Sequence, residues 1–173
     1  MKLSTWTLAA TLTLAACSSD SSTPRAPTSP APPPAESWMF NLRFVSVTGP
    51  DNCLVRERSI ELAGTAFSNV PTFIRRSGSS LTISSDLFTN FFGFSNITGT
   101  VAGSDFTATG ALPSGQWTCQ DGTVVRQQAG AARIAGSFSN DGRELTATDV
   151  HGYPLESGGQ VDYTWTWAGT RQN

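Results

Sequence analysis

The segment Val161-Asp162-Tyr163-Thr164-Trp165-Thr166-Trp167 decides the fold class, because apolar and polar side chains alternate along it residue by residue. A β-strand places successive side chains on opposite faces, so a period of two is typical of a strand with one buried face. The segment from Trp38 to Phe44 alternates in the same way near the start of the folded part. Both ends of the folded part are therefore predicted to be strands with an aromatic, buried face.

Shorter candidate strands lie between these two segments, separated by Gly, Pro, Asn and Asp residues that favour turns. They are residues 59–67, 72–76, 80–85, 96–102, 106–111, 116–120, 123–127, 133–139 and 144–150. No long stretch shows a persuasive helical period. We therefore expect an all-β fold of about eight to ten strands, either an antiparallel up-and-down β-barrel or, alternatively, a β-sandwich.

A weak internal repeat indicates that the strands pair as hairpins in chain order. Ile97-Thr98-Gly99-Thr100-Val101 and Ile134-Ala135-Gly136-Ser137-Phe138 each lead through a turn into a second strand. Leu62-Ala63-Gly64-Thr65-Ala66 is interpreted as a third, degenerate copy of the opening strand. A glycine inside a strand removes a side chain where a curved sheet needs close approach. The repeat therefore favours a strongly curved sheet.

The first and last strands also resemble those of the calycin group, the lipocalin-like and avidin-like β-barrels. In that group a Trp on the first strand packs against an Arg at the end of the last strand and closes one end of the barrel. The matching positions here are Trp38 and Arg171. Glu36 stands where lipocalins usually carry a glycine, two places before the Trp. The resemblance implies a closed barrel with an apolar interior.

The N-terminus has the layout of an export signal, with Lys2 followed by an uncharged, largely apolar run from Leu3 to Ala16. This run is shorter than the roughly 20 apolar residues that span a bilayer. Leu14-Ala15-Ala16-Cys17 resembles the bacterial lipobox, with an ordinary signal peptide and a chance cysteine as the alternative. The resemblance implies cleavage before Cys17, lipid on its thiol and attachment to a membrane of the bacterial cell envelope. Ser18 after the cysteine implies the outer membrane in a Gram-negative cell.

The predicted organisation follows from a change of composition along the chain. Residues 1–16 form the signal peptide, and residues 17–37 form a Ser/Pro-rich linker with almost nothing apolar to bury, which we expect to be disordered. Residues 38–173 remain as a single domain that is long enough to bury a core.

The charge balance restricts the partners of this domain. The chain carries 11 basic and 13 acidic residues, and no basic run occurs. Nucleic acid and anionic lipid head groups are therefore not expected as partners. Contact with a membrane is expected through the lipid on Cys17.

The remaining cysteines, Cys53 and Cys119, form a pair in a compartment that permits disulfide bonds. We expect them to be bonded, with two free buried thiols as the alternative. No CxxC motif occurs and the chain has one histidine, so neither a metal site nor a cofactor is expected.

Catalytic residues are not indicated by any motif. The single histidine, His151, lies in the turn-like segment His151-Gly152-Tyr153-Pro154 and is predicted to be a surface loop residue rather than a catalytic base. No GxSxG nucleophile elbow occurs. A carboxylate pair such as Glu57 and Glu61 needs a spatial separation that sequence spacing does not give. The protein is therefore predicted not to be an enzyme.

The densest aromatic patch is Leu87-Phe88-Thr89-Asn90-Phe91-Phe92-Gly93-Phe94. In a short helical turn, Leu87, Phe88, Phe91 and Phe92 would share one face. The functional interpretation is that Phe88, Phe91, Phe92 and Phe94 border a hydrophobic pocket or contact a partner. The structural alternative is that these side chains form a plug that joins the core. This is the commoner case, because phenylalanine side chains are usually buried.

Two function hypotheses follow. In the first, the barrel binds a small hydrophobic or amphipathic ligand in its interior. In the second, it is an envelope accessory or proteinase-inhibitor-like protein whose outer surface meets a protein partner. The interior of the barrel separates them, because an empty cavity of several hundred Å³ favours the first and a filled interior favours the second.

The lipid anchor gives a direct prediction. The substitution Cys17→Ser should abolish lipid attachment and send the protein to the soluble fraction or leave it unprocessed, because the apolar run is too short to anchor it. Intact mass spectrometry and membrane fractionation of both forms provide the measurement. Wild-type protein whose mass includes no acyl chains would contradict the lipobox assignment.

Overall fold

The computed structural model describes residues 31, 33–93 and 96–173. The predicted signal peptide, Cys17, most of the linker and Phe94 lie outside these residues. Within the described part of the chain, no helix is long and apolar enough to cross a membrane.

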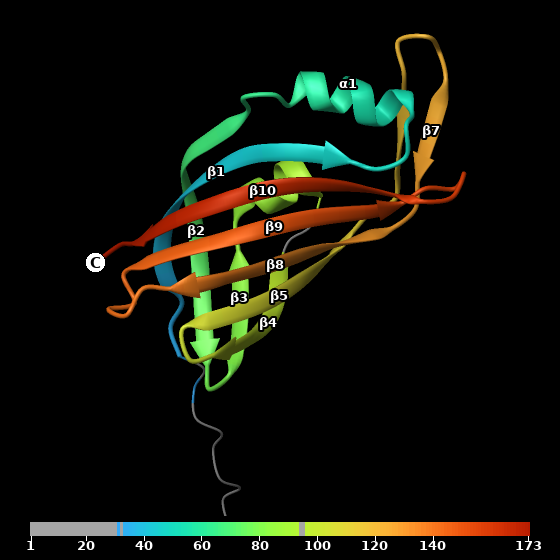
Figure 1. Ribbon diagram of the computed structural model, residues 1–173. Coiled ribbons are helices and arrows are strands. Elements are labelled where there is room, and N and C mark those ends of the chain that lie inside the picture. The colour runs from blue at the N-terminus through green and yellow to red at the C-terminus, as the bar shows by residue number, and fades with distance from the viewer. Residues whose placement is uncertain (1–30, 32, 94–95) are drawn as a thin grey trace, which may run out of the picture. The chain divides into compact units, whose positions relative to one another are not determined.

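Among the described residues, eight antiparallel strands close into a barrel in the order β1-β10-β9-β8-β5-β4-β3-β2 (Figure 1). Neighbours in the barrel follow chain order except at β5 and β8, between which the hairpin β6–β7 stands apart as a small sheet. The prediction of an all-β, up-and-down barrel is therefore confirmed, and the sandwich is excluded. The barrel is compatible with the calycin resemblance. The strands are β1 (Glu36–Thr48), β2 (Ala66–Ser77), β3 (Ser80–Ser84), β4 (Asn96–Ala102), β5 (Asp105–Leu112), β6 (Gly115–Thr118), β7 (Val124–Gln127), β8 (Gly130–Phe138), β9 (Glu144–Pro154) and β10 (Gln160–Arg171).

The seam between β1 and β10 closes the barrel, and the alternating aromatic residues of both strands form its inner face. Phe44 pairs in register with Trp165, and Leu42 with Trp167. The rings of Phe44 and Trp165 meet edge to face at 5.4 Å, and those of Phe40 and Trp167 at 5.5 Å. All five side chains are buried, so the period of two in the sequence separates barrel interior from solvent.

The glycines of the internal repeat lie where neighbouring strands approach closely. A Cβ at Gly99 would collide with the backbone carbonyl of Thr107, and one at Gly136 with that of Thr146. The strand glycines therefore permit the curvature of the barrel, as the repeat predicts.

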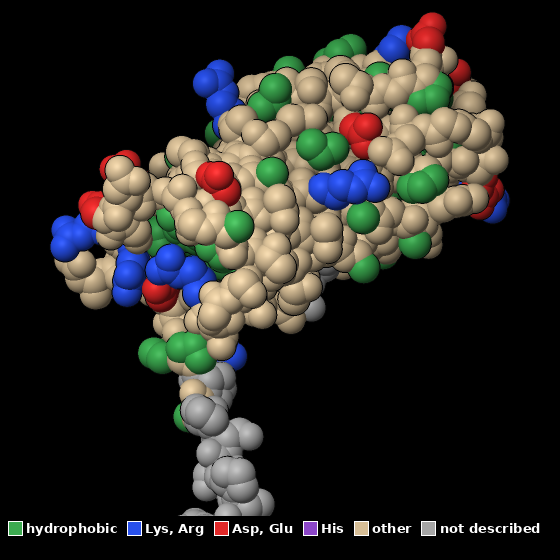
Figure 2. All heavy atoms as spheres, turned by 60° about the horizontal axis from the view of Figure 1, so that its bottom comes forward, with side chains coloured by type: hydrophobic (Ala, Val, Ile, Leu, Met, Phe, Trp, Pro, Cys, Tyr) green, Lys and Arg blue, Asp and Glu red, His purple; other side chains and the backbone are tan. Residues whose placement is uncertain are grey.

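The end of the barrel near Trp38 is filled and carries a charged rim. Trp38 is fully buried, lies opposite Arg171 in the β1–β10 register and contacts Phe138 at 5.8 Å. Glu36 accepts a hydrogen bond from Arg76 at 2.7 Å and lies 3.6 Å from Arg171. Glu36 thus holds two arginines at this rim. On the face shown in Figure 2, acidic and basic side chains are interspersed.

Two sequence predictions are wrong at the start of β2. Residues 59–67, predicted as a strand, contain the end of the helix α1 (Cys53–Glu61), a loop and only the first two residues of β2. The helix begins at Asn52, whose side chain accepts a hydrogen bond from the Val55 amide at 3.0 Å, and it buries only Leu54, so it has no apolar stripe to detect. The segment Leu62–Ala66, predicted as a third repeat, lies mostly in the loop, where Gly64 adopts φ +76°.

The predicted disulfide is present and joins Cys53 to Cys119, with the Cα atoms 6.0 Å apart. It links the start of α1, which lies along β1, to the turn of the β6–β7 hairpin (Figure 1). The carboxylate of Asp121 lies near both sulfur atoms, but disulfide sulfurs are not the thiolates that a metal would need. The bond closes a loop across 66 residues, which is worth about 4 kcal/mol in the chain-entropy model. It therefore holds two elements together outside the barrel wall.

Because some glycines lie where two strands approach closely, the effect of a glycine substitution on the free energy of unfolding should depend strongly on its position. Gly136→Ala should lower the free energy of unfolding by about 2 kcal/mol, because the added methyl group meets rigid backbone. Gly115→Ala, where a Cβ meets only ordinary contacts, should change it by less than about 0.5 kcal/mol. Urea denaturation of the two variants measures the difference. Equal stability of both would contradict the role assigned to the repeat glycines.

Candidate ligand pocket at the barrel mouth

The aromatic segment that begins at Leu87 forms a helical turn, as the shared face of its side chains suggested. This turn is the π-helical turn η1 (Phe88–Phe92), which lies between β3 and β4. It ends at Gly93, which adopts φ +79° and donates its N–H to the carbonyl of Phe88. Phe88 and Phe92 are buried, whereas Phe91 is 49% exposed. The segment therefore combines two core residues with one accessible residue.

The buried rings of η1 fill the middle of the barrel. Phe88 stacks on Trp167 at 5.2 Å, and Phe92 contacts Trp165 edge to face at 5.4 Å. Together with Trp38 and Phe40 beyond them, these rings occupy the interior toward the charged rim. Space for a ligand is consequently found at the opposite end, the mouth.

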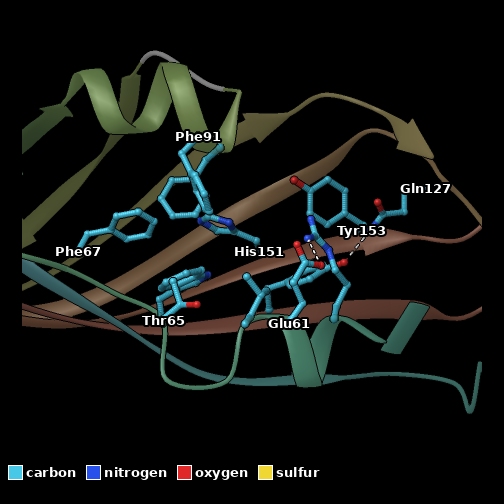
Figure 3. Close-up of a pocket in the computed structure, with 12 residues that line it drawn as sticks. Glu61, Thr65, Phe67, Phe91, Gln127, His151 and Tyr153 are labelled. Carbon is cyan, nitrogen blue, oxygen red and sulfur yellow. Dashed lines mark hydrogen bonds and ion pairs between the residues drawn. The ribbon is translucent and has the colours of Figure 1, made fainter. Parts of the chain in front are cut away.

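A pocket of about 450 Å³ occupies this mouth, between η1 and α1 (Figure 3). Its lining comes from both helical segments, from β2, β7, β9 and β10, and from the loop that precedes β2. The lining residues are Arg58, Glu61, Leu62, Thr65, Phe67, Phe91, Phe92, Gln127, His151, Tyr153, Tyr163 and Trp165.

One side of the pocket is an aromatic wall, which we define as Phe67, Phe91, Phe92 and Trp165. Phe91 meets Phe67 at 4.8 Å and Phe92 at 5.0 Å, both edge to face. Phe67 also lies 5.8 Å from Trp165, so the rings pack on one another and leave no cage between them. The wall therefore offers a continuous apolar surface.

The opposite side is polar and is built around Arg58 of α1. Its guanidinium lies over the ring of Trp117 in β6 at 4.3 Å, and its Nη1 lies 2.8 Å from Glu61. Glu57 accepts hydrogen bonds from the Trp117 indole and the Gln120 amide, each at 2.9 Å. These contacts and the disulfide fix α1 against the hairpin, which gives the polar side a defined geometry.

Two tyrosines extend the polar side toward β7. Tyr153 and Tyr163 meet edge to face at 5.8 Å, and Gln127 donates a hydrogen bond to the Tyr163 hydroxyl at 3.4 Å. Burial raises the pKa of Tyr153 to about 12 and also raises the pKa of Tyr163. Both hydroxyls therefore stay protonated at neutral pH and can donate hydrogen bonds.

The prediction that His151 is a surface loop residue is wrong. Strand β9 continues to Pro154 rather than ending at Val150, so its alternation turns Asp149, His151 and Tyr153 inward. His151 is 2% exposed, and its Nε2 lies 2.8 Å from Oδ2 of the fully buried Asp149. Burial raises the pKa of the Asp149 carboxyl, an effect opposed by the hydrogen bond with His151. The rings of His151 and Phe92 also meet edge to face, with their centroids 4.6 Å apart.

The structure brings only some of the candidate residues together. Phe91 and Phe92 line the pocket, and Phe88 lies beneath them in the core. Trp38 and Arg171 lie at the opposite end of the barrel, and the disulfide lies outside the pocket. Glu57 and Glu61 have separate partners. The lining residues that sequence reasoning missed are Arg58, Leu62, Thr65, Phe67, Gln127, Tyr153, Tyr163 and Trp165. For the two tyrosines and Trp165, the signal was the alternation of β9 and β10.

Comparison of the chain with protein families, curated proteins and solved structures finds no match. The function of the protein is therefore inferred from the geometry and chemistry of the pocket.

The tyrosines predict an unusual alkaline titration. The chain has two tyrosines, both in the pocket, so tyrosinate absorbance reports on this site alone. Folded protein should form little tyrosinate near pH 10, whereas protein unfolded in urea should titrate there. Because the folded-state pKa is raised, stability should be complete below pH 10 and fall as the pH rises toward 12. Titration of either tyrosine near pH 10 in folded protein would contradict this environment.

Proposed function

We propose that the protein is a lipid-anchored protein of the bacterial cell envelope that binds a small hydrophobic or amphipathic ligand at its barrel mouth without altering it chemically. Lipid on Cys17 holds it on the membrane, which in a Gram-negative cell is the outer membrane. The observation that carries the ligand-binding part is the pocket of about 450 Å³ with an aromatic wall on one side and polar groups on the other.

The size and lining of the pocket support a small-molecule ligand. Ligand sites in proteins commonly measure about 300–1,000 Å³ and combine apolar walls with a few placed polar groups. Burying one methylene group against the aromatic wall contributes about 0.8 kcal/mol. A chain of about ten carbons therefore contributes up to about 8 kcal/mol, which offsets the entropic cost of association when the polar side satisfies the head group.

The disulfide supports an exported location. Disulfides persist in the periplasm and outside the cell and are rare in the cytosol, where thiols are kept reduced. Here the bond joins α1 and the hairpin, both of which contribute pocket residues. The disulfide that holds these pocket elements together therefore requires the oxidising conditions that an exported protein meets.

The burial of His151 supports binding rather than catalysis. A general base must come within hydrogen-bond reach of the proton it removes. The Nε2 of His151 is engaged by Asp149, the ring packs against Phe92, and the side chain is 2% exposed. The pair is therefore better suited to hold the pocket floor than to reach a substrate.

Two half-exposed phenylalanines test the pocket directly. Phe91→Ala should weaken binding of the apolar fluorophore N-phenyl-1-naphthylamine about tenfold, because it removes one ring of the aromatic wall. Its free energy of unfolding should change by less than about 1 kcal/mol. Phe73→Ala is the matched control, since Phe73 is 50% exposed on the outer face of β2 and should leave binding unchanged.

Native mass spectrometry of the full-length protein taken from its own membrane complements this titration. A bound small molecule that is present with Phe73→Ala and lost with Phe91→Ala would support the proposal. Absence of both a bound molecule and fluorophore binding would contradict it. A co-purifying protein in place of a small molecule would favour a role on the outer surface.

A further inference from the structure

The polar side of the pocket contains a cation whose charge is already neutralised. Arg58 is held between Glu61, 2.8 Å from its Nη1, and the face of Trp117. An incoming anionic head group would have to share Arg58 with Glu61 and lose its own hydration. Arg58 is therefore not available as a simple anion receptor.

The second polar pair adds no positive charge. The imidazole of His151 lies 2.8 Å from the carboxylate of Asp149, so the pair offers no unmatched cation. Glu57, next to Arg58 along α1, is a further acidic group that binds Trp117. Arg58 and Glu61 cancel, and Glu57 adds a negative charge, so the charged groups around the mouth sum to a negative charge, which disfavours a carboxylate or phosphate.

The remaining polar groups are uncharged hydrogen-bonding groups. Tyr153 and Tyr163 present hydroxyls, and Gln127 presents an amide. Donors and acceptors of this kind match hydroxyl groups, which both donate and accept.

We infer that the mouth selects amphiphiles with an uncharged, hydroxyl-rich head group over fatty-acid-like anions, and that Glu61 sets this preference by neutralising Arg58. The inference rests on the proposed function. The apolar tail lies on the aromatic wall, and the head group bonds to the tyrosines and Gln127. Figure 3 shows Phe67 and Phe91 on one side of the pocket and Tyr153 and Gln127 on the other, as this orientation needs.

Three ligands with the same tail and different head groups test the preference. Decyl glucoside, decanoate and decyltrimethylammonium are titrated into the full-length, detergent-exchanged protein by calorimetry at neutral pH, each below its micelle-forming concentration. Decyl glucoside should bind about tenfold more tightly than decanoate, a difference of about 1.4 kcal/mol. Tighter binding of decanoate than of decyl glucoside would overturn the inference.

Glu61→Gln isolates the residue that sets the preference. Glu61 is half exposed at the end of α1, so the substitution should preserve the fold, which a thermal melt verifies. It leaves Arg58 uncompensated and should tighten decanoate binding about tenfold, a larger change than in the binding of decyl glucoside. The matched control Glu144→Gln removes the same charge at the far end of β9 and should change neither affinity.

The outcomes separate the inference from the proposed function. Unchanged decanoate binding by Glu61→Gln would overturn the role of Glu61, even if decyl glucoside binds most tightly. If folded wild-type protein binds none of the three ligands and no apolar fluorophore, the pocket is not a ligand site and the proposed function fails with the inference. Binding of all three with equal affinity would leave the proposed function standing and overturn the selectivity.

Discussion

The pairing of β1 with β10 is the contact on which the rest of the structure depends. It joins the first strand to the last, removes both open edges of the sheet and encloses the aromatic rings that alternate along these strands. Closure also fixes how much interior exists. Because Phe88 enters from η1 and stacks on Trp167, the interior toward Trp38 is filled and the remaining space lies at the mouth. The position of the pocket thus follows from the closure of the barrel and from the side chains that fill its other end.

The polar half of the site depends on elements outside the barrel wall. Helix α1 buries only Leu54 and is too short to be stable alone, so its position relies on tertiary contacts. The disulfide, the Arg58–Trp117 stack and the Glu57–Trp117 hydrogen bond supply them. The barrel strands provide Phe67, Trp165 and the two tyrosines, whereas the covalently clamped helix and hairpin provide Arg58, Glu61 and Gln127. The polar side is therefore shared between the barrel wall and the elements packed on it.

The sequence predicted the parts of the fold that local pattern controls. The strand at residues 96–102 matches β4 at both ends, and alternation located β1 and β10, because a buried face imposes its period on the strand. It failed at α1, which is stabilised by a cap and a disulfide rather than by an apolar face. It also failed at His151, where Gly152 and Pro154 suggested a turn although the strand continues. The pocket was not predictable, since it joins α1, η1 and β9 across long sequence separations.

The buried Asp149–His151 pair lies where the barrel core meets the floor of the pocket. A barrel core gains little net stability from an ion pair, since apolar residues of similar volume usually serve as well. The hydrogen bond with Asp149 instead orients the imidazole ring, which meets the Phe92 ring edge to face at 4.6 Å. Phe92 in turn contacts Phe91 and Trp165, so the polar pair belongs to the same packed cluster as the aromatic wall. The floor of the pocket is therefore built from a buried polar pair and aromatic rings packed against each other.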